Sequence, residues 1–94
     1  MIFVIDGERI NESIAQSLMS EENYVSCLEY KLNIFVTHNI DYFSISITEY
    51  EPVSIYNSRF VCEDFDNDKS LEDCIDKLLE ILITDIEDNN NGIQ

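Results

Sequence analysis

Few residues in this 94-residue chain could carry chemistry: one histidine, three cysteines and twenty carboxylates. A cysteine nucleophile with His38 as its base is conceivable for Cys27 or Cys62, but neither has a basic neighbour that would favour the thiolate. One histidine and widely separated thiols do not form a zinc site of ordinary spacing. The only glycines, Gly7 and Gly92, supply no phosphate-binding loop. We therefore expect no catalytic residue, no cofactor and no metal, and a protein that is not an enzyme.

Three alternate carboxylates, Asp64, Asp66 and Asp68, match the first three ligand positions of an EF-hand calcium loop. The match fails at Lys69, which stands where the loop needs glycine, and at Ile75, which replaces the bidentate glutamate. Acid and base catalysis by paired carboxylates would need one of them to be buried, and the surplus here lies on a predicted solvent face. We expect at most weak cation binding in this acidic loop.

The charge balance restricts the partners that the chain could bind. Twenty acidic residues stand against five basic ones, and the formal net charge is −15. Such a chain repels nucleic acid and anionic membranes, so basic surfaces of other proteins are the expected partners. The N-terminus lacks a basic signal region, no apolar run reaches membrane-spanning length, and the odd cysteine count fits a reducing compartment. We expect a cytoplasmic protein, either a monomer or a homodimer.

The carboxylates are concentrated in residues 63–88, which hold eleven of them and two lysines. Ser70 is a good N-cap, and Asp73 completes a capping-box-like pair, so a long helix is predicted to follow. Its apolar face is expected to be buried and consists of Leu71, Cys74, Ile75, Leu78, Leu79, Leu82 and Ile86, with Ile81 and Ile83 at its edges. Within an arc of about 60° on the opposite face lie Asp73, Asp76, Glu80 and Glu87.

The charges at the end of this helix are unfavourable for its stability. Asp85, Glu87 and Asp88 occupy the last predicted turn, where the helix dipole disfavours anions. Only Lys77 is spaced to pair with carboxylates on the acidic face. Because the repulsion is tolerated, we interpret the acidic face as a surface directed at another molecule.

The rest of the chain divides into short apolar segments. Residues 2–5 end in Asp6-Gly7, which is typical of a hairpin turn, although a helix beginning at Asp6 is a competing interpretation. The chain is then expected to form a helix (11–19), a break (20–23), a strand (24–37), a turn (38–41), a strand (42–50) and a third strand (53–62) with a bulge near 57–58.

These segments predict an α+β domain over residues 1–88. A three-stranded antiparallel sheet, with a possible extra N-terminal hairpin, is packed on one face by a short N-terminal helix and a long acidic C-terminal helix. The covered face is expected to consist of Leu32, Ile34, Val36, Ile45 and Ile47. Residues 89–94 are predicted to be a flexible C-terminal tail.

The uncovered face of the predicted sheet is polar and contains tyrosines. Tyr42 and Tyr50 are expected there among serines and threonines. Tyrosine is enriched at protein interfaces because it offers a large contact area with one polar tip. The same composition is also ordinary for an exposed antiparallel surface, so both interpretations stay open.

The acidic surface suggests an inhibitor that imitates nucleic acid. An edge formed by Asp73, Asp76, Glu80 and Glu87, extended by Asp64, Asp66 and Asp68, could occupy a basic groove. Over residues 11–88, the size, acidity and element order resemble small phage-encoded anti-defence proteins, especially anti-CRISPR proteins that inhibit CRISPR nucleases. This resemblance implies blocking of the nucleic-acid channel or the PAM-reading site. The alternatives are an immunity protein or antitoxin that neutralises a basic toxin, and a non-catalytic acidic adaptor.

Overall fold

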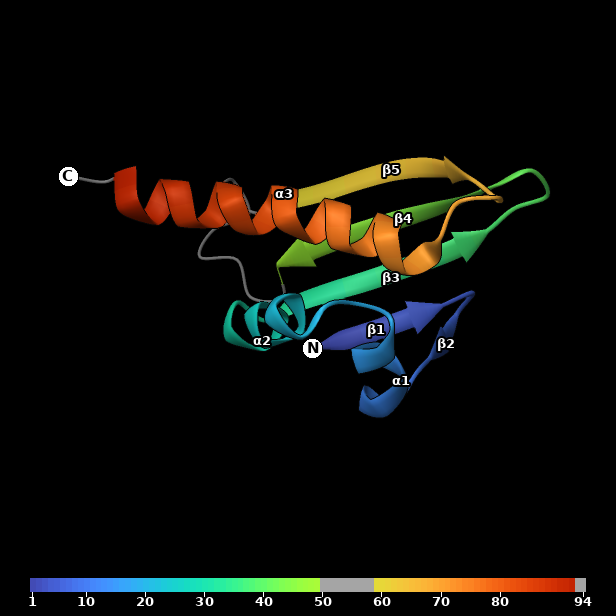
Figure 1. The fold of residues 1–94 in the computed structure, drawn as a ribbon, viewed down its shortest axis with the longest axis horizontal. Helices are drawn as coiled ribbons and strands as arrows, with labels where there is room; N and C mark the ends of the chain where they lie inside the picture. Colours follow the sequence, from blue (N-terminus) through green and yellow to red (C-terminus); the bar gives the residue numbers. More distant parts are fainter. Residues whose placement is uncertain (50–58, 93–94) are drawn as a thin grey trace.

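The computed structural model describes the backbone of residues 1–49 and 59–92 as an α+β fold (Figure 1). A five-stranded mixed sheet has the strand order β2-β1-β3-β4-β5, and a long C-terminal helix is packed on it. The elements in chain order are β1 (Ile2–Ile5), β2 (Glu8–Arg9), α1 (Glu12–Ser17), α2 (Glu21–Glu29), β3 (Leu32–His38), β4 (Tyr42–Glu49), β5 (Phe60–Asp66) and α3 (Leu71–Gly92). Among the helices described, none is long and apolar enough to cross a lipid bilayer.

The N-terminal hairpin is confirmed, and the competing helix that begins at Asp6 is wrong. Asp6 and Gly7 have φ values of 50° and 83°, which suit the tight turn that joins two antiparallel strands. The sequence did not predict that β1 also pairs in parallel with β3, for example Phe3 with Ile34. The predicted three-stranded antiparallel sheet is therefore corrected to a mixed sheet of five strands. Helices α1 and α2 form the long crossover that a parallel pair of strands requires.

The predicted break at residues 20–23 is wrong, because a second helix begins there. The Ser20 hydroxyl accepts a hydrogen bond from the Asn23 N–H at 3.2 Å, which caps α2. Tyr24 and Cys27, expected in a strand, are buried residues of α2 at helical spacing. Lys31, with a φ of 53°, reverses the chain between α2 and β3. The predicted helix cap at Asn11 is confirmed by its side chain, which accepts from the Ile14 N–H at 3.0 Å.

The antiparallel arrangement of β3, β4 and β5 is confirmed, and so is the covered face of the sheet. All five expected residues, Leu32, Ile34, Val36, Ile45 and Ile47, are buried. One row of paired residues crosses the sheet from Phe3 through Ile34 and Ile47 to Val61. The predicted start of the third strand at residue 53, and the bulge near residues 57–58, lie outside the described residues.

Helix α3 follows the predicted apolar pattern closely. The Ser70 hydroxyl accepts from the Asp73 N–H at 3.3 Å, as expected for an N-cap. Ile83 is buried, whereas Ile81 at the other edge of the apolar face is 49% exposed. Helical backbone continues through Gly92, so the predicted end of the helix near Asp88 is wrong.

The three helices contribute to one hydrophobic core on a single face of the sheet. Ala15 of α1, Cys27 of α2 and Leu79 of α3 belong to the same buried cluster as the strand residues Ile34 and Ile45. Side chains alternate along each strand, so every second residue of β3, β4 and β5 points to the opposite face. In the part of the chain that the structure describes, no helix covers that opposite face (Figure 1).

Candidate functional site

The strongest candidate surface is the set of exposed α3 carboxylates that have no cationic partner among the described residues. We call Glu72, Asp73, Glu80, Glu87 and Asp88 the α3 ridge. Asp73, Glu80 and Glu87 recur every seven residues, which places them on the same side of the helix at intervals of about 10.5 Å. The one side-chain contact in the ridge is a long one, from the Tyr30 hydroxyl to Glu87 Oε1 at 3.5 Å.

Asp76 does not belong to this ridge, although the sequence predicted that it would. Its Oδ1 atom accepts hydrogen bonds from the Ser20 backbone N–H at 2.9 Å and from Asn23 Nδ2 at 2.8 Å. Asn23 is buried, and Asp76 itself is half-buried. The carboxylate lies at the N-terminus of α2, where the helix dipole favours a negative charge. Asp76 therefore joins α2 to α3 and is not available to a partner.

The nearby cations neutralise the side of α3 that faces β5. Lys77 was expected to pair along the helix, but its Nζ contacts Glu63 Oε2 of β5 at 3.0 Å. The same ammonium group lies 5.5 Å from the centroid of the Phe65 ring. Arg59 binds Glu49 at 3.1 Å and approaches Asp85 at 3.6 Å. No α3 ridge carboxylate forms an ion pair with Lys77 or Arg59, although Asp73 lines a shallow pocket together with Lys69 and Lys77.

The predicted continuous acidic edge is divided between opposite faces of the sheet. Residues 64–66 form part of β5 and not a loop, and Val61, Glu63 and Phe65 alternate with them on the α3 side. Asp64 and Asp66 consequently lie on the open face, where Asp64 Oδ1 accepts from the Ser44 hydroxyl at 2.6 Å. Tyr42, which is 41% exposed, pairs with Asp66 across the strands. Asp68 is exposed in the turn before α3, and Tyr50 lies outside the described residues.

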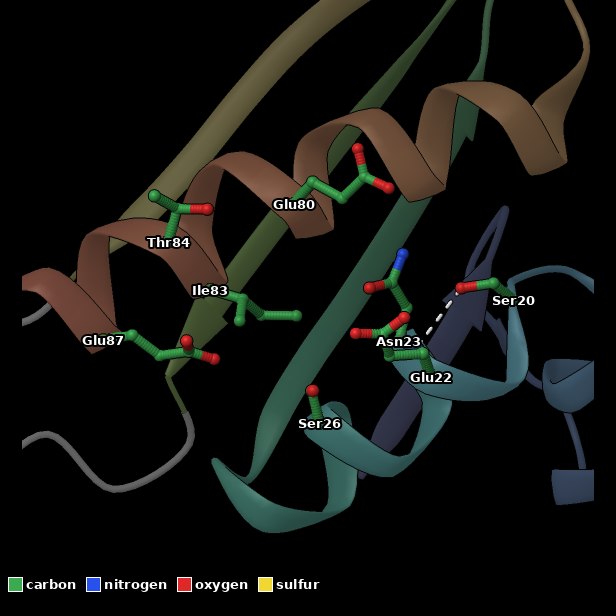
Figure 2. Close-up of a pocket in the computed structure, with 8 residues that line it drawn as sticks. All are labelled: Ser20, Glu22, Asn23, Ser26, Glu80, Ile83, Thr84 and Glu87. Carbon is green, nitrogen blue, oxygen red and sulfur yellow. Dashed lines mark hydrogen bonds between the residues drawn. The ribbon is translucent and has the colours of Figure 1, made fainter.

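A cleft between α2 and α3 adjoins the α3 ridge (Figure 2). It has a volume of about 210 Å³ and is lined by Ser20, Glu22, Asn23, Ser26, Glu80, Ile83, Thr84 and Glu87. Three carboxylates, those of Glu22, Glu80 and Glu87, therefore border one opening. Sequence reasoning missed this cleft because it assigned the residues of α2 to a break and a strand. The capping pattern of Ser20 followed by acidic residues is the signal that could have revealed it.

The cysteine and histidine side chains do not come together. The register places His38 opposite Phe43 and Cys62 opposite Ser46, so three residue positions and β4 separate them. Burial raises the pKa of Cys27 to about 12, which keeps its thiol protonated at neutral pH. Among the described residues, no group of three histidine, cysteine or carboxylate side chains is placed to hold a metal ion.

His38 instead forms a pair with Asp6 that the sequence did not reveal. Asp6 Oδ1 accepts from the His38 backbone N–H at 2.6 Å, and Oδ2 lies 2.8 Å from His38 Nδ1. These contacts, the backbone hydrogen bond first, lower the pKa of the Asp6 carboxyl group. The pair ties the β1–β2 turn to the end of β3 and lies on the surface.

The structure thus defines two acidic surfaces: the α3 ridge, and the open-face cluster of Tyr42, Asp64 and Asp66. They lie on opposite sides of the sheet, so a rigid partner would contact one of them at a time. Comparisons with protein-family models, with curated proteins and with solved structures found no match.

Proposed function

We propose that this protein is a non-catalytic inhibitor that binds a basic, nucleic-acid-binding surface of another protein and denies it to nucleic acid. The observation that carries the proposal is the α3 ridge. Its carboxylates are exposed on a helix whose opposite face is anchored in the core, and none of them forms an ion pair with another described residue. A preformed anionic surface of this kind loses little entropy when it meets a cationic groove.

The charge density of the ridge suits the path of one nucleic-acid strand. Glu72 and Asp88 are separated by about 24 Å of helix at 1.5 Å per residue, so the five ridge carboxylates are on average about 6 Å apart along the helix axis. A single strand of DNA carries about one charge per 3.4 Å, and the duplex about one per 1.7 Å of axis. The charge density of the ridge is a little over half that of a single strand and less than a third of that of the duplex, which favours a groove that contacts one strand.

The cleft beside the ridge provides a place for a cationic anchor. Glu22, Glu80 and Glu87 border it, and a lysine or arginine side chain from the partner would meet carboxylates from both helices. Charge-assisted hydrogen bonds are shorter and stronger than neutral ones, and such anchors dominate many interfaces. The cleft would therefore add specificity to an attraction that the ridge supplies over a longer range.

The partner class we propose is a host-defence nuclease of the CRISPR or restriction type, in keeping with the resemblance to small phage-encoded anti-defence proteins. The test is a panel of purified basic nucleases, which also includes nuclease toxins, assayed for cleavage with the protein added before or after the nucleic acid. We expect inhibition when the protein is added first and weak inhibition when it is added last. Inhibition of the toxins alone would identify an immunity protein, and equal inhibition in both orders would contradict competition for the groove.

A further inference from the structure

We propose that the free edge of β5 accepts an extended basic segment of a partner protein as a sixth strand of the sheet. This surface is separate from the α3 ridge, so the inference goes beyond the proposed function and is tested independently of it. Strand addition of this kind derives its affinity from backbone hydrogen bonds and its specificity from alternate side chains.

Strand β5 lies at the end of the sheet and pairs with β4 without a bulge. Seven consecutive residues are in register, from Phe60 opposite Thr48 to Asp66 opposite Tyr42. Just before this ladder, the Glu49 N–H donates to the Arg59 carbonyl at 3.3 Å. Hydrogen-bonded and non-hydrogen-bonded pairs alternate in an antiparallel ladder. The backbone groups of Phe60, Cys62, Asp64 and Asp66 therefore point away from β4, toward the free edge.

These edge groups are largely unpaired among the described residues. The one backbone hydrogen bond that they form there is at the Asp66 carbonyl, which accepts from the Lys69 N–H at 3.0 Å. Proteins usually protect such an edge with lysine, proline, a bulge or a covering segment. Strand β5 contains no lysine or proline, and its register shows no bulge. Among the described residues, its protection is negative charge alone, which disfavours acidic partners and favours basic ones.

The side chains of β5 indicate a cationic occupant. Asp64 and Asp66 lie on the open face at one end of the strand, and Phe60, which is 66% exposed, lies with Cys62 at the other. Opposite charges directly across a strand pair are favourable, and like charges are unfavourable. A second copy of this chain would oppose its own acidic strand and a net charge of −15. An extended segment would complement the whole of β5 if it placed lysine or arginine opposite the two aspartates and an apolar residue opposite Phe60.

The probe is an acetylated, amidated heptapeptide with lysine at positions one and three, valine at five, tyrosine at seven and threonine between them. When the peptide pairs with β5 in antiparallel register, its positions one, three, five and seven lie opposite Asp66, Asp64, Cys62 and Phe60, respectively. Two methylated versions carry the same charge: one is N-methylated at positions three and five, whose amides would face β5, and the other at four and six, whose amides would face away. Binding is measured by fluorescence anisotropy, and amide protection by hydrogen exchange in NMR spectra.

We expect the unmodified peptide to slow exchange at Cys62 and Asp64, and methylation at positions three and five to weaken binding about tenfold or more. Methylation at positions four and six should change affinity less than threefold. In the protein, Cys62→Pro removes one edge donor and should weaken binding relative to Cys62→Ser, while Asp73→Asn with Glu80→Gln on the α3 ridge should not. Proline is tolerated where an edge N–H faces solvent, so the β4 ladder is retained.

Two outcomes would overturn the proposal, and neither depends on whether Cys62→Pro folds. Equal affinity for the two methylated peptides would show that the lysines bind without strand pairing. Protection of the β5 amides that appears without peptide and rises with protein concentration would assign the edge to a second copy of the chain. Failure of the α3 ridge to inhibit any nuclease would leave both measurements unaffected.

Discussion

Two carboxylates on α3, four residues apart, have different roles because their neighbours differ. Asp76 accepts two hydrogen bonds from the start of α2, whereas the Glu80 side chain has no hydrogen-bond or ion-pair partner among the described residues. A helical wheel places both on the acidic face, and only the position of α2 separates them. On the acidic face, Asp76 therefore has a structural role, whereas the Glu80 carboxylate is available to bind a partner.

Replacing Asp76 with alanine should destabilise the fold. Two donors, including one on the buried Asn23, would lose a charged acceptor, and we expect the free energy of unfolding to fall by about 1–3 kcal/mol. Glu80→Ala is the matched control, and its effect should lie within about 0.5 kcal/mol of zero. Urea denaturation of both variants provides the measurement. Equal effects would mean that Asp76 does not hold α2 against α3.

The Asp6–His38 pair predicts a specific loss of stability in acid. Because the folded state lowers the pKa of Asp6, the folded protein binds a proton there less readily than the unfolded chain. The contribution is present above the usual value of 3.8 and is lost as the pH falls through the lower folded value. Asp6→Asn keeps a residue that tolerates a positive φ, so the difference between wild type and this variant should shrink as the pH falls below about 4.

The measurement for Asp6 is the urea midpoint of both proteins across this pH range. Comparison with the variant removes the general effect of protonating the other carboxylates, which reduces repulsion in both proteins alike. A difference that stays constant with pH would contradict the proposed contribution of the ionised carboxylate.

At the scale of elements, the sequence predicts a helix or strand correctly where its hydrophobic periodicity fits only one of the two. Residues of α3 follow a helical period over several turns, and β4 alternates strictly, so both were identified. Residues 24–30 fit a strand and a helix about equally well, and their assignment depends on Tyr24 and Cys27 packing into the core. The parallel pairing of β1 with β3 depends on a crossover of two helices, and no local pattern in residues 2–5 specifies a partner strand.

The place of β1 in the core can be tested with two phenylalanines. Phe3 is 2% exposed and packs in the row that contains Ile34, whereas Phe60 is 66% exposed at the sheet edge. Phe3→Ala should cost about 3–5 kcal/mol of unfolding free energy, and Phe60→Ala about 0.5 kcal/mol or less. Chemical denaturation of the two variants would show this contrast. A small cost at Phe3 would contradict a sheet in which β1 lies beside β3.

At the scale of the whole molecule, the excess of negative charge should make stability depend on salt. The net charge is −15, and no α3 ridge carboxylate forms an ion pair with another described residue. Added sodium chloride screens this repulsion, so the Tm should rise with salt. The variant Asp73→Asn, Glu80→Gln, Glu87→Gln should show a smaller rise in differential scanning calorimetry. A flat or falling Tm in the wild-type protein would contradict unrelieved repulsion.

The candidate surfaces were only partly predictable from the sequence. The helical period of α3 correctly grouped Asp73, Glu80 and Glu87, because a wheel needs only local geometry. It could not show that Asp76 is engaged by α2, since that contact joins segments 53 and 56 residues apart in the chain. The helical period also could not show that Asp64 and Asp66 lie on the face of the sheet opposite to the α3 ridge. That placement depends on the side-chain alternation and the register of β5.

The most direct test of the account measures the association rate with a nuclease that the protein inhibits, by stopped-flow fluorescence over a range of salt concentrations. The triple ridge variant with Asp76 intact is compared with the open-face variant Asp64→Asn, Asp66→Asn. We predict association about tenfold or more slower for the ridge variant at low salt, with a weaker salt dependence, and a rate near that of wild type for the open-face variant. An unchanged rate for the ridge variant would contradict the claim that the α3 ridge is the surface that meets the nuclease.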